Sequence, residues 1–219
     1  MSGKTATLVG ATGLIGGDLL KQLLTDPYFE NVRILVRKPF TMEHPKLQKK
    51  LVDFNDADSL LVALDGSDVV FVAIGTTQKK VRGDKEAYRK IDHAIPVNIA
   101  RYCKMIGCKI FILVSSIGAN SKSNNFYLKL KGEVEDAIMK IGIETVHIMQ
   151  PSMLLGKRSE SRPLEKIGQP LMNAFSFLLP AKYKPIQAKE VAKAMLVASK
   201  KNENGFFVYE YREIKNLNS

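Results

Sequence analysis

The sequence has few of the residues that build a disulfide framework or a metal site. It contains only two cysteines, Cys103 and Cys108, on one predicted helix and the turn that follows it. This number argues against a disulfide framework, and we expect two buried, small apolar side chains. The three histidines, His44, His93 and His147, lie far apart and lack the spacing of metal ligands. We therefore expect no metal site, and we interpret His147 as a core residue whose ring nitrogens are hydrogen-bonded.

Long hydrophobic runs are also absent. No stretch approaches the ~18 uninterrupted apolar residues that a membrane-spanning helix needs. The N-terminus passes from Met-Ser-Gly-Lys almost directly into a strand-like segment, without the basic region, apolar region and cleavage site of a secretion signal. We therefore expect no membrane association and a cytoplasmic location.

Acidic residues are fewer than basic ones, and 22 Asp and Glu against 33 Lys and Arg give a formal net charge of +11. A nucleic-acid-binding protein usually gathers such charge into a stripe or an arm. Here the lysines are scattered along the sequence, as at Lys49, Lys79, Lys104, Lys129, Lys184 and Lys200. We expect no nucleic-acid partner, and a solvated basic surface that steers an anionic cofactor toward its cleft.

Short apolar runs alternate with longer amphipathic segments almost throughout the chain. Strands without polar alternation, separated by helices, are typical of a parallel sheet covered on both faces. We therefore predict an α/β fold with a three-layer, doubly wound parallel sheet. The predicted strands are 5–9, 32–36, a short strand beginning at 51, 68–73, 109–114, 144–149 and 206–211. The predicted helices are 14–24, 57–64, 85–106, 127–141 and 190–199.

The regular pattern loosens after Pro151. Residues 156–185 mix proline, glycine, serine and arginine with one apolar stretch, and we interpret residues 156–188 as a small C-terminal flap over a substrate cleft. The basic side chains Lys157, Arg158 and Arg162 in this segment could form either an anion pocket or a polar lid. No repeat or linker divides the chain, so we expect one domain over residues 1–219.

Three glycines recur at every third residue between the first predicted strand and the first predicted helix. Gly10 would permit a tight turn, Gly13 would let the backbone approach a pyrophosphate, and Gly16 would let the helix pack closely on the strand. The start of the helix presents free N–H groups and the positive end of its dipole to an anion. This placement predicts the dinucleotide-binding turn of a Rossmann fold, formed by Gly10, Thr12, Gly13, Leu14, Ile15 and Gly16.

The end of the second predicted strand carries Arg37 and Lys38. Rossmann proteins that prefer NAD place an acidic residue there, which holds the ribose hydroxyl groups. A guanidinium instead binds a 2′-phosphate through charge-assisted hydrogen bonds. The sequence therefore predicts NADP(H) as the cofactor.

Tyr127 and Lys131 are four residues apart at the start of a predicted helix, so they share one helix face. Ser115 and Ser116 end the preceding strand, and in a parallel sheet the strand ends meet at the ligand-binding edge. A second Tyr-x-x-x-Lys pair, Tyr211 with Lys215, lacks this context.

The chemistry of this set is proton transfer to or from a substrate oxygen. A phenol ionises near pH 10 in water, and a neighbouring ammonium group favours the phenolate. We predict that Tyr127 is the acid/base, that Lys131 supports it and holds the nicotinamide ribose, and that a serine orients the substrate oxygen. We favour Ser116 for that role, and Ser115 remains open because the strand register is not determined.

Together these motifs resemble the atypical short-chain dehydrogenases/reductases. Three further segments are similar to the Tat-interactive oxidoreductase family: residues 73–77 (AIGTT), 126–134 (FYLKLKGEV) and 158–163 (RSESRP). The resemblance extends from about residue 5 to residue 163 and more loosely beyond. It implies a Rossmann fold that binds NADPH.

By position, the resemblance implies that Gly75 and Thr76 lie along the cofactor, that Asp53 and Phe54 flank the adenine, and that backbone around Pro151 lies near the nicotinamide. Many extended members of the family have an asparagine on the fourth helix that completes a proton relay, and Asp92 takes that place here.

We therefore predict an NADP(H)-dependent oxidoreductase that transfers hydride between nicotinamide and a small carbonyl or alcohol substrate. Two alternatives stay open: an NADPH-sensing regulator that binds a protein partner, and an enzyme resembling nucleotide-sugar epimerases. The sequence leaves the substrate, the direction of reaction and homodimer formation undetermined.

Overall fold

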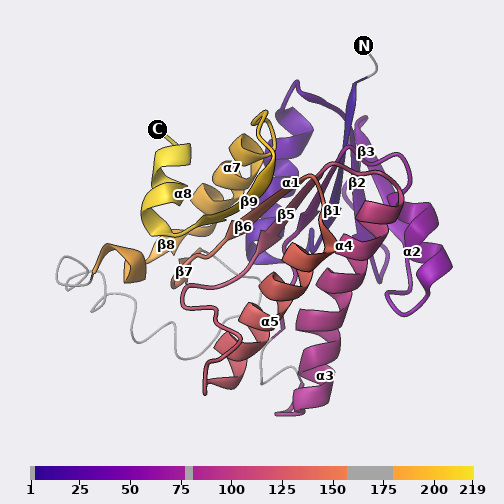
Figure 1. The fold of residues 1–219 in the computed structure, drawn as a ribbon. Coiled ribbons are helices and arrows are strands. Elements are labelled where there is room, and N and C mark those ends of the chain that lie inside the picture. The colour runs from indigo at the N-terminus through magenta and orange to yellow at the C-terminus, as the bar shows by residue number, and fades with distance from the viewer. Residues whose placement is uncertain (1–2, 77–80, 157–179) are drawn as a thin grey trace.

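A computed structural model describes residues 3–76, 81–156 and 180–219 of the chain. In these residues, seven parallel strands form one sheet in the order β3-β2-β1-β4-β5-β6-β9. The chain runs outward from β1 to β3 and then returns to place β4 on the other side of β1 (Figure 1). Ligands of such sheets bind beyond the carboxyl ends of the strands, at this reversal. The strands are β1 (Lys4–Val9), β2 (Phe29–Val36), β3 (Leu47–Leu51), β4 (Val69–Val72), β5 (Ile110–Val114), β6 (Thr145–Met149) and β9 (Gly205–Tyr209).

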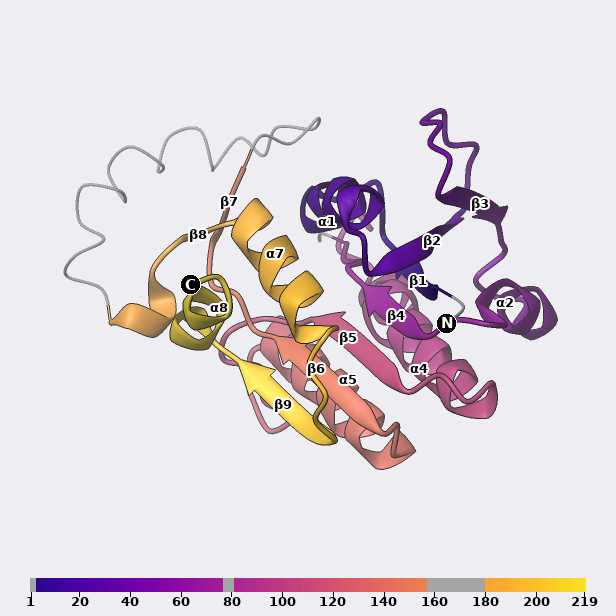
Figure 2. The ribbon, with the colours of Figure 1, turned by 90° about the horizontal axis from the view of Figure 1, so that it is seen from above.

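Helices cover both faces of the sheet. Figure 2 shows α1 and α7 on one face and α4 and α5 on the other. A second, small sheet pairs β7 (Leu154–Leu155) with β8 (Ile186–Gln187) in parallel. The helices are α1 (Leu14–Thr25), α2 (Ala57–Leu64), α3 (Lys85–Arg89), the π-helix η1 (Lys90–Ala94), α4 (Ile95–Met105), α5 (Phe126–Ile141), the 3-10 helix η2 (Ala181–Tyr183), α7 (Ala188–Ala198) and α8 (Tyr211–Leu217).

Two hydrophobic clusters, one on each face, hold these layers together. Along β5, Ile112 packs into the cluster that includes α1 and α7, whereas Phe111 and Leu113 pack into the cluster that includes α4 and α5. All four residues of β4 are buried. Full burial of a large aliphatic or aromatic side chain contributes roughly 1.5–3 kcal/mol, so a strand buried on both faces needs the continuous apolar sequence that predicted it.

The predicted three-layer α/β architecture is confirmed, with differences at its edges. The prediction that the third strand begins at 51 is wrong, because β3 ends there. Three of the five residues of this edge strand, Gln48, Lys50 and Leu51, are exposed, so the strand lacks the apolar run of a buried one. The strand predicted for 206–211 ends at Tyr209, because Glu210 and Glu213 form a capping box that starts α8. The predicted helix 85–106 is interrupted by the π-helix η1.

Most of the predicted flap lies outside the described residues, and so do Lys157, Arg158 and Arg162. The described residues on either side of it, 154–155 and 186–187, pair as β7 and β8, and the sequence did not indicate this pairing. Among the described helices, none combines the length and the apolar composition needed to cross a bilayer.

His147 lies in the core, as predicted, and is 0% exposed. Its ring stacks on Phe207 with centroids 5.4 Å apart, and its Nδ1 lies 3.0 Å from the Tyr209 hydroxyl. Its Nε2 has no hydrogen-bond partner among the described residues, so the expectation that both ring nitrogens are hydrogen-bonded is wrong. Burial disfavours the imidazolium and lowers the pKa of His147 to about 4.

This burial predicts a loss of stability in mild acid. Between pH 6.5 and about 4 the unfolded chain binds a proton at His147 that the folded chain does not, so the free energy of unfolding falls as pH falls. The full effect is about 3 kcal/mol. Denaturant titrations across this range should show a steeper fall for the wild type than for His147→Asn, with His44→Asn as the control that keeps the wild-type slope. Equal slopes for the wild type and His147→Asn would contradict the prediction.

Candidate active site

The glycine turn after β1 is packed too closely for a side chain at Gly10 and Gly16, and tightly at Gly13. Gly10 has a φ of +101°, and a Cβ there would lie 2.5 Å from the Ala73 carbonyl oxygen. A Cβ on Gly16 would lie 2.0 Å from the Gly10 carbonyl oxygen, and one on Gly13 would lie 3.2 Å from it. The turn and the first turn of α1 are therefore in direct backbone contact, which is the arrangement predicted for Gly10 and Gly16.

The N-terminus of α1 is suited to an anion. Its cap residue, Gly13, offers no side-chain hydrogen bond, and the first turn contains no acidic residue. The backbone N–H groups of this turn and the positive end of the helix dipole thus lie after the carboxyl end of β1 without a competing carboxylate in that turn. Of the other predicted contacts, Thr12 is exposed, Ile15 is buried in the core, and Leu14 packs beside Gly156. Ile15 can therefore offer a ligand only its backbone.

Two exposed basic residues, Arg37 and Lys38, lie in the bend directly after β2. Neither side chain makes a hydrogen bond or an ion pair with another described residue, so both are free for a ligand.

The residues that follow the neighbouring β3 were predicted to flank the adenine. Asp53 is exposed and accepts hydrogen bonds from the backbone and side chain of Asn55, which lower its pKa. Phe54 is half-buried against the cluster on the α4–α5 face.

Asp92, on the π-helix, connects the loop after β4 to α5. One carboxylate oxygen, Oδ2, accepts the Thr76 backbone N–H at 2.7 Å, and the other, Oδ1, lies 3.1 Å from the Lys131 ammonium. The Asp92 and Lys131 side chains are 0% and 7% exposed. A Cβ on Gly75 would be in ordinary contact with Oδ1 of Asp92, at 3.5 Å. The π-helical turn, a feature frequent at functional sites, thus places a carboxylate between two predicted site elements.

Tyr127 and Lys131 lie together on α5, as predicted. Asn125 caps this helix by accepting the Tyr127 backbone N–H at 3.0 Å. The Lys131 ammonium is 5.8 Å from the centroid of the Tyr127 ring, and the Tyr88 ring meets that ring edge-on at 6.5 Å. The Tyr88 hydroxyl in turn donates to the Thr76 carbonyl oxygen at 3.2 Å. The half-buried phenol and the buried ammonium are therefore held at the same edge as the β4 loop.

The second Tyr-x-x-x-Lys pair has a different environment. Lys215 of α8 forms an ion pair with Glu190 of α7 at 2.5 Å, and both side chains are partly exposed. Its ammonium is therefore used in helix packing at the surface, away from Tyr127.

The two serines after β5 have different partners. Ser115 is buried, and its hydroxyl donates to the carboxylate of Glu135, a residue of α5. Gln150, after β6, donates its amide to both oxygens of the same carboxylate, at 3.0 and 2.9 Å. Ser116 is half-buried, and its hydroxyl makes only a long contact of 3.4 Å with the Ile117 carbonyl oxygen.

The loop that carries the serines is held against α5 and the β6 end by its backbone. A Cβ on Gly132 would lie 2.1 Å from the Ser121 nitrogen, so only glycine lets the loop approach the helix here. The Ile117 N–H donates to the carbonyl oxygen of the buried Pro151 at 3.1 Å. Pro151 thus lies next to the serine loop, at the position where backbone was predicted near the nicotinamide.

Sequence reasoning did not select Glu135 or Tyr88. Glu135 follows Lys131 by four residues, as Lys131 follows Tyr127, so the helical spacing was a usable signal. Tyr88 has no comparable signal, because its contact with Tyr127 joins elements that are distant in sequence.

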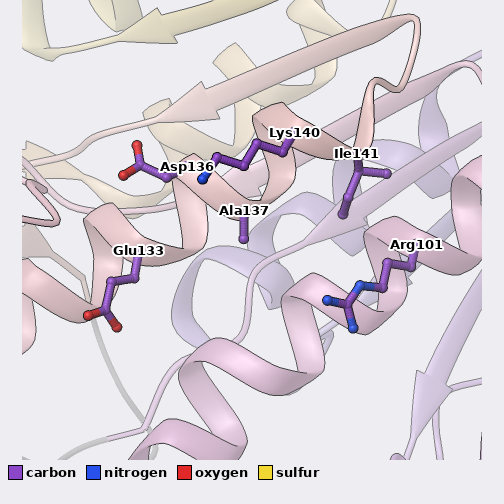
Figure 3. Close-up of a pocket in the computed structure, with 6 residues that line it drawn as sticks. All are labelled: Arg101, Glu133, Asp136, Ala137, Lys140 and Ile141. Atoms are coloured by element: carbon purple, nitrogen blue, oxygen red, sulfur yellow. The ribbon is translucent and has the colours of Figure 1, made fainter.

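A separate hollow of about 400 Å³ lies between α4 and α5 (Figure 3). It is lined by basic, acidic and apolar residues: Arg101, Glu133, Asp136, Ala137, Lys140 and Ile141. None of the predicted site residues takes part in it, and Glu133 and Asp136 lie on a different side of α5 from the buried Lys131 and Glu135. We therefore place the candidate site at the strand ends and not in this hollow.

Comparison with known proteins agrees with this geometry. The model of the NAD(P)H-binding family matches residues 10–198. Protein FMP52, mitochondrial, of Candida albicans is 35% identical over 206 residues, which cover 90% of this chain and 89% of that protein. Protein HTATIP2 of Rattus norvegicus is 34% identical over 168 residues, covering 75% and 69%. Among solved structures, MoeE5 in complex with UDP-glucose and NAD has a TM-score of 0.72 and 15% identity, covering 96% and 79%.

These relatives correct one prediction. Several carry the name "mitochondrial", which contradicts the cytoplasmic location expected from the sequence. That expectation was based on the lack of an apolar secretion signal. Mitochondrial addresses are instead amphipathic and arginine-rich, so the absence of an apolar segment does not test for them.

The glycine turn, the uncapped start of α1 and the strand order are those of a dinucleotide-binding sheet, and the similarity covers most of the sequence. The chain belongs to the NAD(P)H-binding family, in the group that contains FMP52 and HTATIP2.

Proposed function

We propose that the chain is an NADP(H)-dependent oxidoreductase of the short-chain dehydrogenase/reductase type that interconverts a small carbonyl compound and its alcohol. The observation that carries the proposal is the convergence of the glycine turn with the Tyr127–Lys131 pair at one edge of the sheet. A nucleotide-binding protein without redox chemistry has no need of a phenol beside a buried ammonium group at that edge.

The residues present fit a dinucleotide. The turn from Gly10 to Gly16 would hold a pyrophosphate at the start of α1, where glycines let the backbone pack closely and the helix N-terminus has no acidic residue. The free basic groups of Arg37 and Lys38 suit a 2′-phosphate. Gly75, Thr76 and the backbone of Pro151 would lie along the rest of the cofactor, with Asp53 and Phe54 beside the adenine.

When bound, nicotinamide would supply or accept the hydride, and the chain's own residues transfer the proton to or from the substrate oxygen. In reduction, Tyr127 donates its hydroxyl proton to the carbonyl oxygen while hydride adds to the carbonyl carbon. The C=O π bond breaks, and a C–H bond and an O–H bond form; oxidation is the reverse. Ser116 orients the substrate oxygen through a hydrogen bond. Lys131 stabilises the phenolate that remains, and Asp92 holds its ammonium group in place.

The alternatives have less support. A regulatory NADPH sensor would not need Tyr127 and Lys131, whereas contacts from Asn125, Tyr88 and Asp92 hold both residues in defined positions. An epimerase-like activity is suggested by solved structures such as the UDP-N-acetylglucosamine 4-epimerase from Methanobrevibacter ruminantium, and at 19% identity that likeness concerns the fold.

Removing the Tyr127 hydroxyl should remove most of the turnover and leave cofactor binding nearly unchanged. Tyr127→Phe is expected to lower kcat by about 10²- to 10⁴-fold, the usual contribution of a positioned acid/base. NADPH affinity should change little, because the ring and the Lys131–Asp92 pair remain. Turnover is followed as NADPH oxidation across aldehydes and ketones, and binding by fluorescence titration. Tyr211→Phe, in the second Tyr-x-x-x-Lys pair, is the matched control, and equal rates for both variants would rule out the mechanism.

Arg37 should determine the preference between the two nicotinamide cofactors. Hydrogen bonds to charged groups contribute ~1.5–3 kcal/mol, so Arg37→Ala should weaken NADPH binding by about tenfold or more. NADH lacks the 2′-phosphate, and its dissociation constant should stay nearly constant. Arg101→Ala, on α4, removes the same charge away from the site and serves as the control. A parallel loss for both cofactors, or no loss for NADPH, would show that Arg37 does not bind the 2′-phosphate.

A further inference from the structure

Glu135 is a buried carboxylate that the proposed proton transfer does not use. It lies on α5, one turn beyond Lys131, and is 9% exposed. It accepts hydrogen bonds from Ser115, at the end of β5, and from Gln150, at the end of β6. A single side chain therefore joins α5 to two neighbouring strand ends at the candidate site.

A carboxylate in this position carries an electrostatic cost. Burial raises the pKa of Glu135, while the donors Ser115 and Gln150 oppose that rise because they favour the ionised form. Two charged groups of the same helix also act on it: Asp136 repels the carboxylate and Lys131 attracts it. The neighbours contributed by β5 and β6, Ser115 and Gln150, are uncharged. An apolar residue would fill the same space without this cost, so the carboxylate requires a reason beyond packing.

The hydrogen bond from Ser115 also distinguishes the two serines. A hydroxyl group has one hydrogen to donate, and that of Ser115 is used by Glu135. It cannot at the same time be donated to a substrate oxygen. Ser116 has only the long contact with the Ile117 carbonyl oxygen, so its hydrogen is available.

We propose that Glu135 is a positioning residue, which holds Ser115 and Gln150 so that the serine loop presents Ser116, and not Ser115, to the substrate oxygen. This inference rests on the proposed function, since it concerns the same proton-transfer site. It assigns to Glu135 no contact with substrate or cofactor: the carboxylate acts through the two strand ends that it joins.

The test compares Glu135→Gln with Glu133→Gln, the same substitution two residues away on the hollow-facing side of α5. The amide introduced at position 135 opposes the Gln150 amide with a second donor, so the strand ends should shift. A small misplacement of reacting groups costs on the order of 10²-fold in rate, and kcat for E135Q should fall by about 10- to 100-fold. NADPH affinity and the kcat of E133Q should stay close to wild type. The double variant E135Q/Q150E restores the match of donor and acceptor and should recover part of the lost rate.

The pH profile and the serine variants give readouts that a purely structural role would not change. Wild-type kcat should decline in acid with a midpoint above the ordinary range of a glutamate, because the pKa of Glu135 is raised, and E135Q should lack this step. Ser116→Ala should lose most of the turnover. Ser115→Ala removes one hydrogen bond to Glu135 and keeps the two from Gln150, so it should lose less turnover than Ser116→Ala. The reverse order for the serines, or an E135Q variant that matches E133Q, would overturn the proposal while leaving the proposed function intact.

A measurement independent of turnover covers the case in which E135Q folds poorly or no substrate is found. Carbon-13 NMR of labelled glutamate carboxyl groups gives the midpoint of Glu135. Ser115→Ala removes a donor that favours the carboxylate, so it should raise that midpoint, and Ser116→Ala should not. An unchanged midpoint in Ser115→Ala would overturn the assignment of the two serines. Failure of the wild type to bind NADPH would instead refute the proposed function, and the two failures are thereby distinguished.

Discussion

The site depends on a buried ion pair between Asp92 and Lys131. An isolated ammonium group in this position would be strongly disfavoured, and loss of one member of such a pair costs about 3–5 kcal/mol. Both oxygens of Asp92 are used, one by Lys131 and one by the Thr76 backbone. The loop after β4, the π-helix and α5 are therefore fixed relative to one another by a single carboxylate. The position of Tyr127, one turn before Lys131, follows from this arrangement.

Much of the fold could be predicted because a parallel sheet covered on both faces imposes a simple pattern. Strands such as β4, buried at every position, read as uninterrupted apolar runs. The pattern fails where this constraint is relaxed. The edge strand β3 is exposed along much of its length and accepts lysines. Helix α8 starts at a capping box and has only seven residues, so its three apolar positions, Tyr211, Ile214 and Leu217, are too few to give a clear helical period. Short pairings such as β7–β8 have no periodicity to detect.

The candidate site was predictable to the extent that its residues are related by local spacing. The glycine turn and the Tyr127–Lys131 pair each belong to one element, so sequence distance determines their geometry. The side-chain partner of Ser115, Glu135, belongs to another element, and a strand end does not reveal which way its last side chains point. Asp92 was assigned by resemblance to the place of an asparagine. Its pairing with Lys131 and Thr76 depends on how three elements converge, which sequence spacing does not encode.

The β7–β8 pair has a consequence for variation among related chains. It holds Leu154–Leu155 beside Ile186–Gln187, so the stretch of chain between them starts and finishes at one place. Closing a longer loop costs little, ~0.6 kcal/mol for each doubling of its length. Insertions, deletions or replacements between these two strands would leave the glycine turn and the Tyr127–Lys131 pair in place, because both belong to other elements. Related chains can therefore differ in length between β7 and β8 while they keep the same seven-stranded sheet.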